Sequence, residues 1–302
     1  MKSNIVHQKI SDLYKSLNLP IEQEIDFTIH FLPDIHSKTP FTSPVFRAEY
    51  FSFVFVKNGH GNYTIDERKF DFESNTIYFT NPGHIKSFEI KECKDVYIIT
   101  LTESFLRENV HSDIFNEFPF LLAEIVSPKT LSGKEFSEFE ILYRQIESEF
   151  NKDSQYKNRI LGNLFVILLL KIKEKFWASY NPIVEGDRNS EIIKSFKILL
   201  EQKFREIVSK DVENNFLVQD YANELNLHPN YLNSVVKSKT GKTVNDWISK
   251  RTLSTAKSLL KNTTFSAKEI AYKLGFSEPT HFSRFFKKHT KQSPSSFRTE
   301  HK

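Results

Sequence analysis

The pattern of apolar and polar positions divides the chain into a strand-rich part followed by a helix-rich part. Between residues 25 and 101 the apolar positions form short β-branched and aromatic runs, which are separated by turn-forming residues at NGHGN and TNPGH. Runs of this kind at this spacing predict a compact sandwich or barrel. The predicted strands are FTIHFL (27–32), YFSFVFV (50–56), NYTID (62–66), TIYFT (76–80) and VYIITL (96–101).

From Ser104 onward the apolar period changes to that of a helix. Apolar residues recurring at i, i+3 and i+4 predict two antiparallel helices at about 134–153 and 155–179. The second contains ILGNLFVILLL (160–170), whose 11 residues fall short of the roughly 20 that a membrane span needs. The polar segment SYNPIVEGDRNS (179–190) contains Pro and Gly and predicts an interdomain linker.

The last third of the chain contains an internal duplication. Each copy predicts a short helix, a tight turn and a second helix, which together form a helix-turn-helix. Gly275 and Asn226 stand at matching turn positions and suit a positive φ angle. The matching apolar pairs are Tyr221/Ile270, Ala222/Ala271, Leu225/Leu274 and Leu227/Phe276 at a separation of 49 residues, and Leu232/Phe282, Val235/Phe285 and Val236/Phe286 at 50 residues.

One continuous helix is predicted between the two copies. The segment VNDWISKRTLSTAKSLLK (244–261) has 18 residues, which corresponds to a length of about 27 Å. A rigid rod of this size could hold two recognition helices about one duplex turn, ~34 Å, apart on one side of DNA. The duplication and its spacer therefore predict DNA binding.

Charge separates the same two parts of the chain. From Ser209 to the C-terminus, 16 Lys and Arg stand against 8 Asp and Glu, a net charge of +8. The preceding 208 residues hold 26 basic and 30 acidic groups, a net charge of −4. A basic segment on a mildly acidic body favours a polyanionic partner, although solvated lysines alone produce the same asymmetry.

The stretch GFSEPTHFSRFFKK (275–288) interleaves phenylalanines with cations. Its aromatic side chains could stack on bases, face a membrane, or form the buried side of a helix that displays the cations. The matching positions of the first copy are aliphatic, and aliphatic side chains cannot serve as stacking platforms. We therefore predict that the phenylalanines are core residues and that His281, Arg284 and Lys287 face the DNA.

Cysteine usage and the N-terminal segment indicate a cytoplasmic, soluble protein. Cys93 is the single cysteine, which excludes an internal disulfide and a thiolate zinc cluster and is typical of a small core residue. The N-terminal MKSNIVHQKISDLYKSLNLP lacks the apolar region of a secretory signal. We expect no membrane partner and no cofactor.

Residues 191 to 298 resemble the DNA-binding domain of the AraC/XylS family of bacterial transcription regulators. The resemblance is carried by SAKEIAYKLGFSEPTHFSRFFKKHTKQSPSSFR (266–298), by VQDYANELNLHPNYLNSVVKSKTGKT (218–243) in the first unit, and by RTLSTAKSLL (251–260) as the linker helix. It implies an α+β protein with a cupin-like β-barrel and helical dimerisation segment at 1–178, a linker at 179–190 and an all-α DNA-binding domain at 191–302. The two helix-turn-helix units would span about 217–238 and 266–288.

In this family the second helix of each unit lies in the major groove. The resemblance implies DNA-binding residues Asn230, Asn233, Ser234 and Lys237 in the first unit, and Thr280, His281, Arg284, Lys287 and Lys288 in the second. Arg284 can donate two hydrogen bonds to a guanine edge, and Asn233 can pair with adenine. The chain departs from the family pattern at Leu217, Ser234, Ala267 and Lys291, where Ser or Thr, Arg, a larger apolar residue and Gly are usual.

The N-terminal half resembles the cupin-like sensor domain of these regulators, though less specifically. The supporting runs are NGHGNYTID (58–66) and NTIYFTNPGH (75–84). Metal cupins carry an HxH…E cluster and a later His; no HxH occurs here, so we expect neither a metal site nor catalytic residues. The barrel interior is a candidate pocket for a small-molecule effector, lined by Arg47, Tyr50 and His84, unless these are satisfied core or rim residues.

Three functions compete. The first is a sequence-specific regulator, expected to be an activator, that binds double-stranded promoter or operator DNA as a homodimer and recruits RNA polymerase. The helices at 134–179 would form its dimer seam, or would pack against the barrel instead. The second is a cupin-type enzyme with an appended nucleic-acid-binding domain, and the third is a nonspecific DNA-binding protein. The missing metal ligands disfavour the second, and the different polar faces of the two recognition helices disfavour the third.

Overall fold

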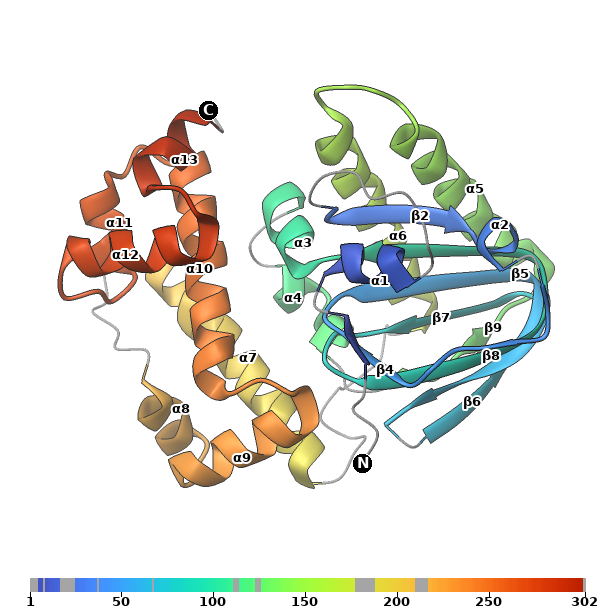
Figure 1. Cartoon of the computed structure of the whole chain (residues 1–302), viewed down its shortest axis with the longest axis horizontal. Helices are drawn as coiled ribbons and strands as arrows, with labels where there is room; N and C mark the ends of the chain where they lie inside the picture. The colour runs from blue at the N-terminus through green and yellow to red at the C-terminus, as the bar shows by residue number, and fades with distance from the viewer. Residues whose placement is uncertain are drawn as a thin grey trace. The chain divides into compact units, whose positions relative to one another are not determined.

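The computed structural model consists of two compact units (Figure 1). One comprises Met1–Val110 and Phe118–Pro182, and the other comprises His111–Glu117 and Ile183–Lys302. The division falls within the predicted linker, of which residues 179–187 lie outside the described residues and residues 188–190 begin a helix. The structure describes residues 5–7, 9–16, 25–36, 38–66, 68–110, 114–122, 126–176, 188–209 and 217–300.

The first unit is built on a curved nine-stranded sheet with the order β1-β4-β8-β5-β7-β9 (Figure 1). Strands β5 and β8 form its antiparallel spine, while β2 and β3 also pair with β8, and β6 pairs with β5. Short helical elements α1 (Ile10–Ser16), α2 (Leu32–Ile35), α3 (Glu103–Asn109) and η1 (Pro119–Leu122) connect or flank the strands. The strands are β1 (Ile5–His7), β2 (Phe27–Phe31), β3 (Phe41–Thr42), β4 (Phe46–Ala48), β5 (Phe51–Ile65), β6 (Arg68–Phe72), β7 (Thr76–Thr80), β8 (Ile85–Leu101) and β9 (Lys129–Thr130).

The predicted break at NGHGN was wrong, because the two strands predicted on either side of it form the single strand β5. The pairing of β5 with β8 continues through this segment with register shifts between Val56 and Gly61. A Cβ atom on Gly61 would lie 2.2 Å from the carbonyl oxygen of Glu89. The glycine is thus needed where the partner backbone approaches closely, so it marks an irregularity within the strand instead of a turn.

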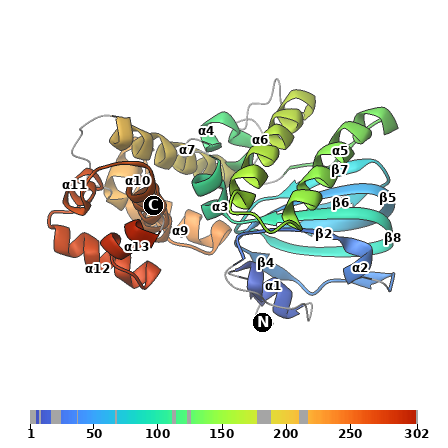
Figure 2. The same ribbon diagram turned by 90° about the horizontal axis from the view of Figure 1, so that it is seen from above.

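Two long helices, α5 (Gly133–Phe150) and α6 (Lys157–Phe176), cover one face of the sheet (Figure 2). They match the predicted helical pair in the described part of the chain. Helix α5 begins with a capping box, in which Ser132 and Glu135 exchange hydrogen bonds. Its buried stripe consists of Phe136, Phe139, Tyr143 and Ile146.

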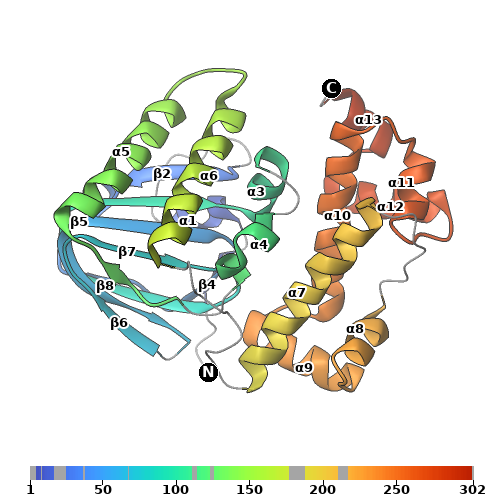
Figure 3. The ribbon, with the colours of Figure 1, turned by 180° about the vertical axis from the view of Figure 1, so that it is seen from behind.

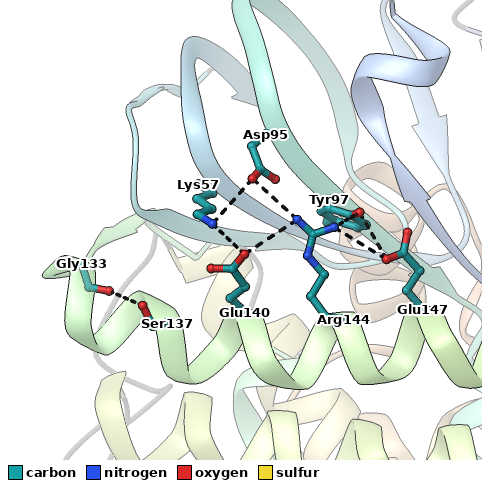
Figure 4. A network of polar contacts seen from close by, with 8 residues as sticks. All are labelled: Lys57, Asp95, Tyr97, Gly133, Ser137, Glu140, Arg144 and Glu147. Carbon is teal, nitrogen blue, oxygen red and sulfur yellow. Dashed lines mark hydrogen bonds and ion pairs between the residues drawn. The ribbon is translucent and has the colours of Figure 1, made fainter.

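Helix α5 is also held to the sheet by a network of charged side chains (Figure 4). Lys57 of β5 donates to Glu140 at 2.7 Å and lies 3.8 Å from Asp95 of β8. The guanidinium of Arg144 lies 4.5 Å from the ring centroid of Tyr97 and 3.7 Å from Asp95. Of the two alternatives that the sequence left open for this helix, packing against the sheet is therefore the one observed for its buried stripe.

The second unit is helical, with α10 (Val244–Asn262) at its centre. Helices α8 and α9 lie towards one end of α10, and α11, α12 and α13 towards the other (Figure 3). One apolar core runs through the unit and includes residues from both ends. The remaining helices are α4 (Ile114–Glu117), α7 (Arg188–Ser209), α8 (Val218–Glu224), α9 (Pro229–Thr240), α11 (Ala267–Lys273), α12 (Pro279–Thr290) and α13 (Pro294–Glu300).

Together the two units confirm the predicted α+β fold, with a sheet-rich N-terminal part and a helical C-terminal part. Within the described ranges, none of the helices combines the length and apolar character that crossing a bilayer requires.

Candidate nucleic-acid interface

The two helix-turn-helix units share the same backbone geometry. In the first unit, α8–α9, the Leu227 amide donates to the Ala222 carbonyl at 2.8 Å; in the second, α11–α12, the Phe276 amide donates to that of Ala271 at 3.0 Å. The preceding turn residue is left-handed in both copies, with φ of 54° at Asn226 and 77° at Gly275. The turn predicted from the duplication is confirmed in both units.

The aromatic residues of α12 form its buried side, as predicted. Phe282 and Phe286 have no exposed surface, and neither do the matching Leu232 and Val236 of α9. Phe285 is half-buried, with its ring centroid 5.4 Å from that of Phe276. Base-stacking by Phe282 and Phe286 is therefore excluded in the folded unit.

The opposite face of α12 is polar and solvent-exposed. The predicted DNA-binding residues Thr280, His281, Arg284, Lys287 and Lys288 are all exposed there. Their spacing of three or four residues places them along one side of the helix. The face thus presents an arginine fork and two ammonium groups together, which suits base edges and phosphates.

The face of α9 carries less charge. Asn230, Ser234 and Lys237 are exposed in the positions that the duplication assigns to them. His228 precedes the helix, and its ring nitrogen accepts from the Asn230 amide at 3.3 Å. Tyr231 is 41% exposed on the same helix, and sequence reasoning did not select it. Its place next to Asn230, before the apolar positions 232, 235 and 236, was the signal available in the sequence.

Asn233 differs from the other predicted contacts because its side chain has a structural partner. It is half-buried, and its Oδ1 accepts from the Val244 amide at 3.0 Å. That amide lies at the start of α10, where no intrahelical acceptor exists. Pairing with adenine requires both the oxygen and the nitrogen of an Asn amide, so it would compete with this bond.

The matching position in the second helix-turn-helix has no backbone amide to accept from. Fifty residues after Asn233 and Val244 stand Ser283 and Pro294. Pro294 opens α13 and has no amide hydrogen to satisfy. Ser283 is exposed on α12, so this position of the second unit needs no structural acceptor.

Two arginines of the helical C-terminal unit have structural roles. Arg251 of α10 is 3% exposed, and its Nε lies 3.2 Å from a Glu201 oxygen of α7. Arg298 donates through Nε to the Leu260 carbonyl at 3.1 Å and through Nη2 to that of Phe265 at 2.5 Å. These contacts fix the central helix, on which the spacing of the two recognition helices depends.

Two of the three residues predicted for a ligand pocket, Arg47 and His84, lie outside the lining of the cavity found inside the sheet. Only Tyr50 lines the cavity found inside the sheet. Arg47 instead donates to the Gly83 carbonyl at 2.9 Å, and His84 Nδ1 lies 2.5 Å from Asp66. Arg47 and His84 are held by local partners, which is the alternative that the sequence left open for them.

Lys86 is the cavity residue that sequence reasoning missed. It belongs to the same period-two face of β8 as Phe88, Ile90 and Ile98, all of which line the cavity. A lysine in register with inward apolar residues was the signal that could have identified it.

Among the described residues, no three His, Cys, Asp or Glu side chains gather as a metal site.

The comparisons with known proteins agree with the geometry of the second unit. A family model described as a helix-turn-helix domain matches residues 221–300. The Msm operon regulatory protein of Streptococcus mutans is 23% identical over 250 residues, which cover 82% of this chain and 83% of that protein. The arabinose operon regulatory protein of Escherichia coli is 27% identical over 160 residues, covering 53% of this chain and 51% of that protein.

A likeness to a solved structure is weaker. ToxT of Vibrio cholerae is 17% identical with a TM-score of 0.35, covering 91% of this chain and 96% of that one.

The duplicated helix-turn-helix with its cationic faces defines a DNA-binding transcription regulator. The domain at its C-terminus is of the AraC type, and its relatives are AraC-family regulators. The alternative of a cupin-type enzyme finds no support among these relatives.

Proposed function

We propose that the chain controls transcription by placing α9 and α12 in adjacent major-groove segments of a promoter. The observation that carries this proposal is the pair of helix-turn-helix units towards opposite ends of α10 (Figure 3). Helix α10 has 19 residues, which gives a length of about 28 Å. This length suits two recognition helices that enter one side of the duplex about one turn, ~34 Å, apart.

Sequence-specific binding of this kind predicts strong enrichment of particular genomic fragments by the purified full-length chain. We expect a shared sequence with two conserved segments, bound roughly 10³-fold or more tightly than random DNA at physiological salt. The matched control is the same selection with Arg284→Ala/Asn230→Ala protein, which should lose the shared sequence but keep phosphate-driven binding. Equal retention of all fragments by the wild-type chain would contradict the proposal.

Dimerisation through α6 is the second element of the proposed function. Ile160, Ile167 and Leu170 are 36%, 44% and 45% exposed on this helix. Their spacing places them on one side, away from the buried stripe that holds α6 in its own unit. A second copy of the chain would cover these side chains and would double the number of helix-turn-helix units on the promoter.

Sedimentation of the full-length chain tests this arrangement. We expect a dimer for the wild type and a monomer for Ile167→Glu/Leu170→Glu, because a buried charge pair of like sign would oppose association. The control is Lys157→Glu, which alters charge at the start of α6 outside the exposed apolar side chains and should remain dimeric. A wild-type chain that sediments as a monomer at micromolar concentration, with or without DNA, would refute the seam.

The proposed role as an activator implies a contact with RNA polymerase, and a site of action in the cytoplasm, where bacterial promoters are found. Transcription from a selected promoter in a purified system would test the sign of regulation. An increase on addition of the chain is expected, whereas a decrease would make it a repressor without affecting the DNA-binding proposal.

A further inference from the structure

A cavity of about 120 Å³ lies inside the curved sheet of the first unit. Its walls are mostly apolar and include Val54, Ile65, Phe72, Val96 and Ile98. A cavity of roughly 150 Å³ in another protein is large enough for benzene. The space therefore suits a molecule with one ring or a short aliphatic chain.

The ammonium group of Lys86 lies in this apolar wall. The lysine is 6% exposed, and its Nζ donates to Thr80 Oγ1 at 2.9 Å. An ammonium group has three hydrogens to donate, and Thr80 is its one hydrogen-bond acceptor among the described residues. No carboxylate in the described part of the chain comes within ion-pair distance of Nζ, although Glu49 and Asp66 are near enough to raise its pKa.

Burial is the dominant influence on Lys86 and lowers its pKa to about 7. An ammonium group in an apolar wall with one neutral partner is unfavourable for folding. A bound anion would supply the missing acceptor and the missing negative charge together. Because Thr80 Oγ1 accepts this bond, its own hydroxyl hydrogen can still donate, so the pair can offer two donors to the same group.

The other titratable groups around the cavity do not compete for this role. Burial lowers the pKa of both His30 and His36, which keeps them neutral at pH 7. His30 Nε2 lies 2.6 Å from the Tyr14 hydroxyl, and Tyr50 lies 3.3 Å from His7 Nδ1. Glu92 is at the wall and pairs with Lys94 and His60. Lys86 is thus the cation of the described lining.

We propose that this cavity binds a small monocarboxylate with an apolar body, whose carboxylate accepts hydrogen bonds from Lys86 Nζ and Thr80. The proposal rests on the proposed function, because the bound acid would act as the effector of the regulator. A single buried cation matches one negative charge, which favours a carboxylate over a phosphate dianion. The small volume favours a one-ring or short-chain acid.

Binding should be linked to protonation of Lys86. A carboxylate favours the charged lysine, so the bound state takes up a proton when the free lysine is neutral. Affinity should therefore be constant between about pH 5 and pH 6, where the acid is ionised and the lysine is charged, and should fall as pH rises above 7, by up to roughly tenfold per unit. Burial lowers the pKa of His30 and His36, so their titration lies on the acid side of the fall expected above pH 7 and does not produce the same profile.

The test is calorimetric titration of the full-length chain at pH 7 with benzoate and hexanoate, beside benzyl alcohol and 1-hexanol. We expect at least one acid to bind roughly tenfold or more tightly than its alcohol, in line with the strength of a charge-assisted hydrogen bond. Lys86→Met should remove this preference, and Thr80→Val should reduce it. The exposed Lys91 of the same strand supplies the control, and Lys91→Met should bind as the wild type does.

The outcomes separate this proposal from DNA binding. Equal affinity for acids and alcohols, unchanged acid binding by Lys86→Met, or no binding of any acid at millimolar concentration would overturn it. Lys86→Met should fold, which its thermal unfolding would verify, and should keep its affinity for random DNA. A loss of DNA binding by the wild-type chain would instead contradict the proposed function.

Discussion

The two helix-turn-helix units use one backbone plan with different side chains. Both have a left-handed turn residue and the same amide–carbonyl bond across the turn. Helix α9 has an aliphatic buried side and a face of Asn, Ser and Lys, whereas α12 has an aromatic buried side and a face of His, Arg and Lys. The comparison shows that the apolar pattern fixes how the helices pack, while the residues between apolar positions are left to determine what each unit binds.

The largest expected effect comes from the two cores. Phe286→Ala should destabilise the second unit by about 3–5 kcal/mol, because a fully buried aromatic side chain is lost. Val236→Ala, at the matching position, should cost about 1–3 kcal/mol, because two carbons are removed instead of a ring. Hydrogen exchange of the full-length chain would locate each loss. If Phe286→Ala increased hydrogen exchange equally in α8–α9 and in α11–α12, the two helix-turn-helix units would not be separately stabilised.

The next effect concerns the polar faces. Arg284→Ala should cost about 1–3 kcal/mol at a selected site and relax the preference at one base pair, because a bidentate contact to guanine is lost. Lys288→Ala should weaken selected and random DNA alike, since an ammonium group on phosphate carries no sequence information. Competition binding at fixed salt measures both. If the two variants lose affinity uniformly for every sequence, Arg284 is not a base-reading residue.

A smaller effect distinguishes Asn233 from its counterpart. Asn233→Ala should destabilise the first unit by about 1–2 kcal/mol, because it leaves the amide of the buried Val244 without its acceptor. Ser283→Ala should change stability by less than about 0.5 kcal/mol, because Pro294 has no amide hydrogen. Chemical denaturation monitored at Trp247 of α10 would measure both. Equal stability of the two variants would show that the hydrogen bond of Asn233 is not structural.

The smallest expected effect is at the ends of the recognition helices. Gly241 ends α9 with a φ of 76°, and Lys291 ends α12 with a φ of 66°. Lys291→Gly should stabilise the second unit by about 0.5–1 kcal/mol, because glycine adopts this conformation without a steric penalty. Gly241→Ala is the reverse change and should destabilise the first unit by a similar amount. Destabilisation by Lys291→Gly would mean that the lysine side chain has a stabilising role in this turn.

Much of the fold could be predicted from the sequence. The seven apolar pairs of the duplication were enough to predict both helix-turn-helix units and the buried side of α12. The continuity of β5 through NGHGN was not predictable, because the glycines there serve a close approach of the partner strand β8. The local sequence shows that a glycine is present, but it does not show which distant strand will pack against that glycine.

The binding sites were harder to predict for the same reason. The helical period placed Asn233 on the recognition face, but its bond to Val244 depends on how α10 starts. Arg47 and His84 were selected by residue type, whereas their partners Gly83 and Asp66 are set by how the strands meet. Lys86 could have been identified from the alternation along β8, because it lies on the same face of the strand as the apolar residues that line the cavity.

Footprinting of a genomic site selected by the full-length chain tests the central claim most directly. The claim is that both recognition helices enter the major groove of one DNA site. The account predicts two protected segments per chain, centred about one helical turn, ~34 Å, apart, and Arg284→Ala should expose bases in only one of them. A single protected segment per chain, or uniform loss of protection in the Arg284→Ala variant, would contradict it.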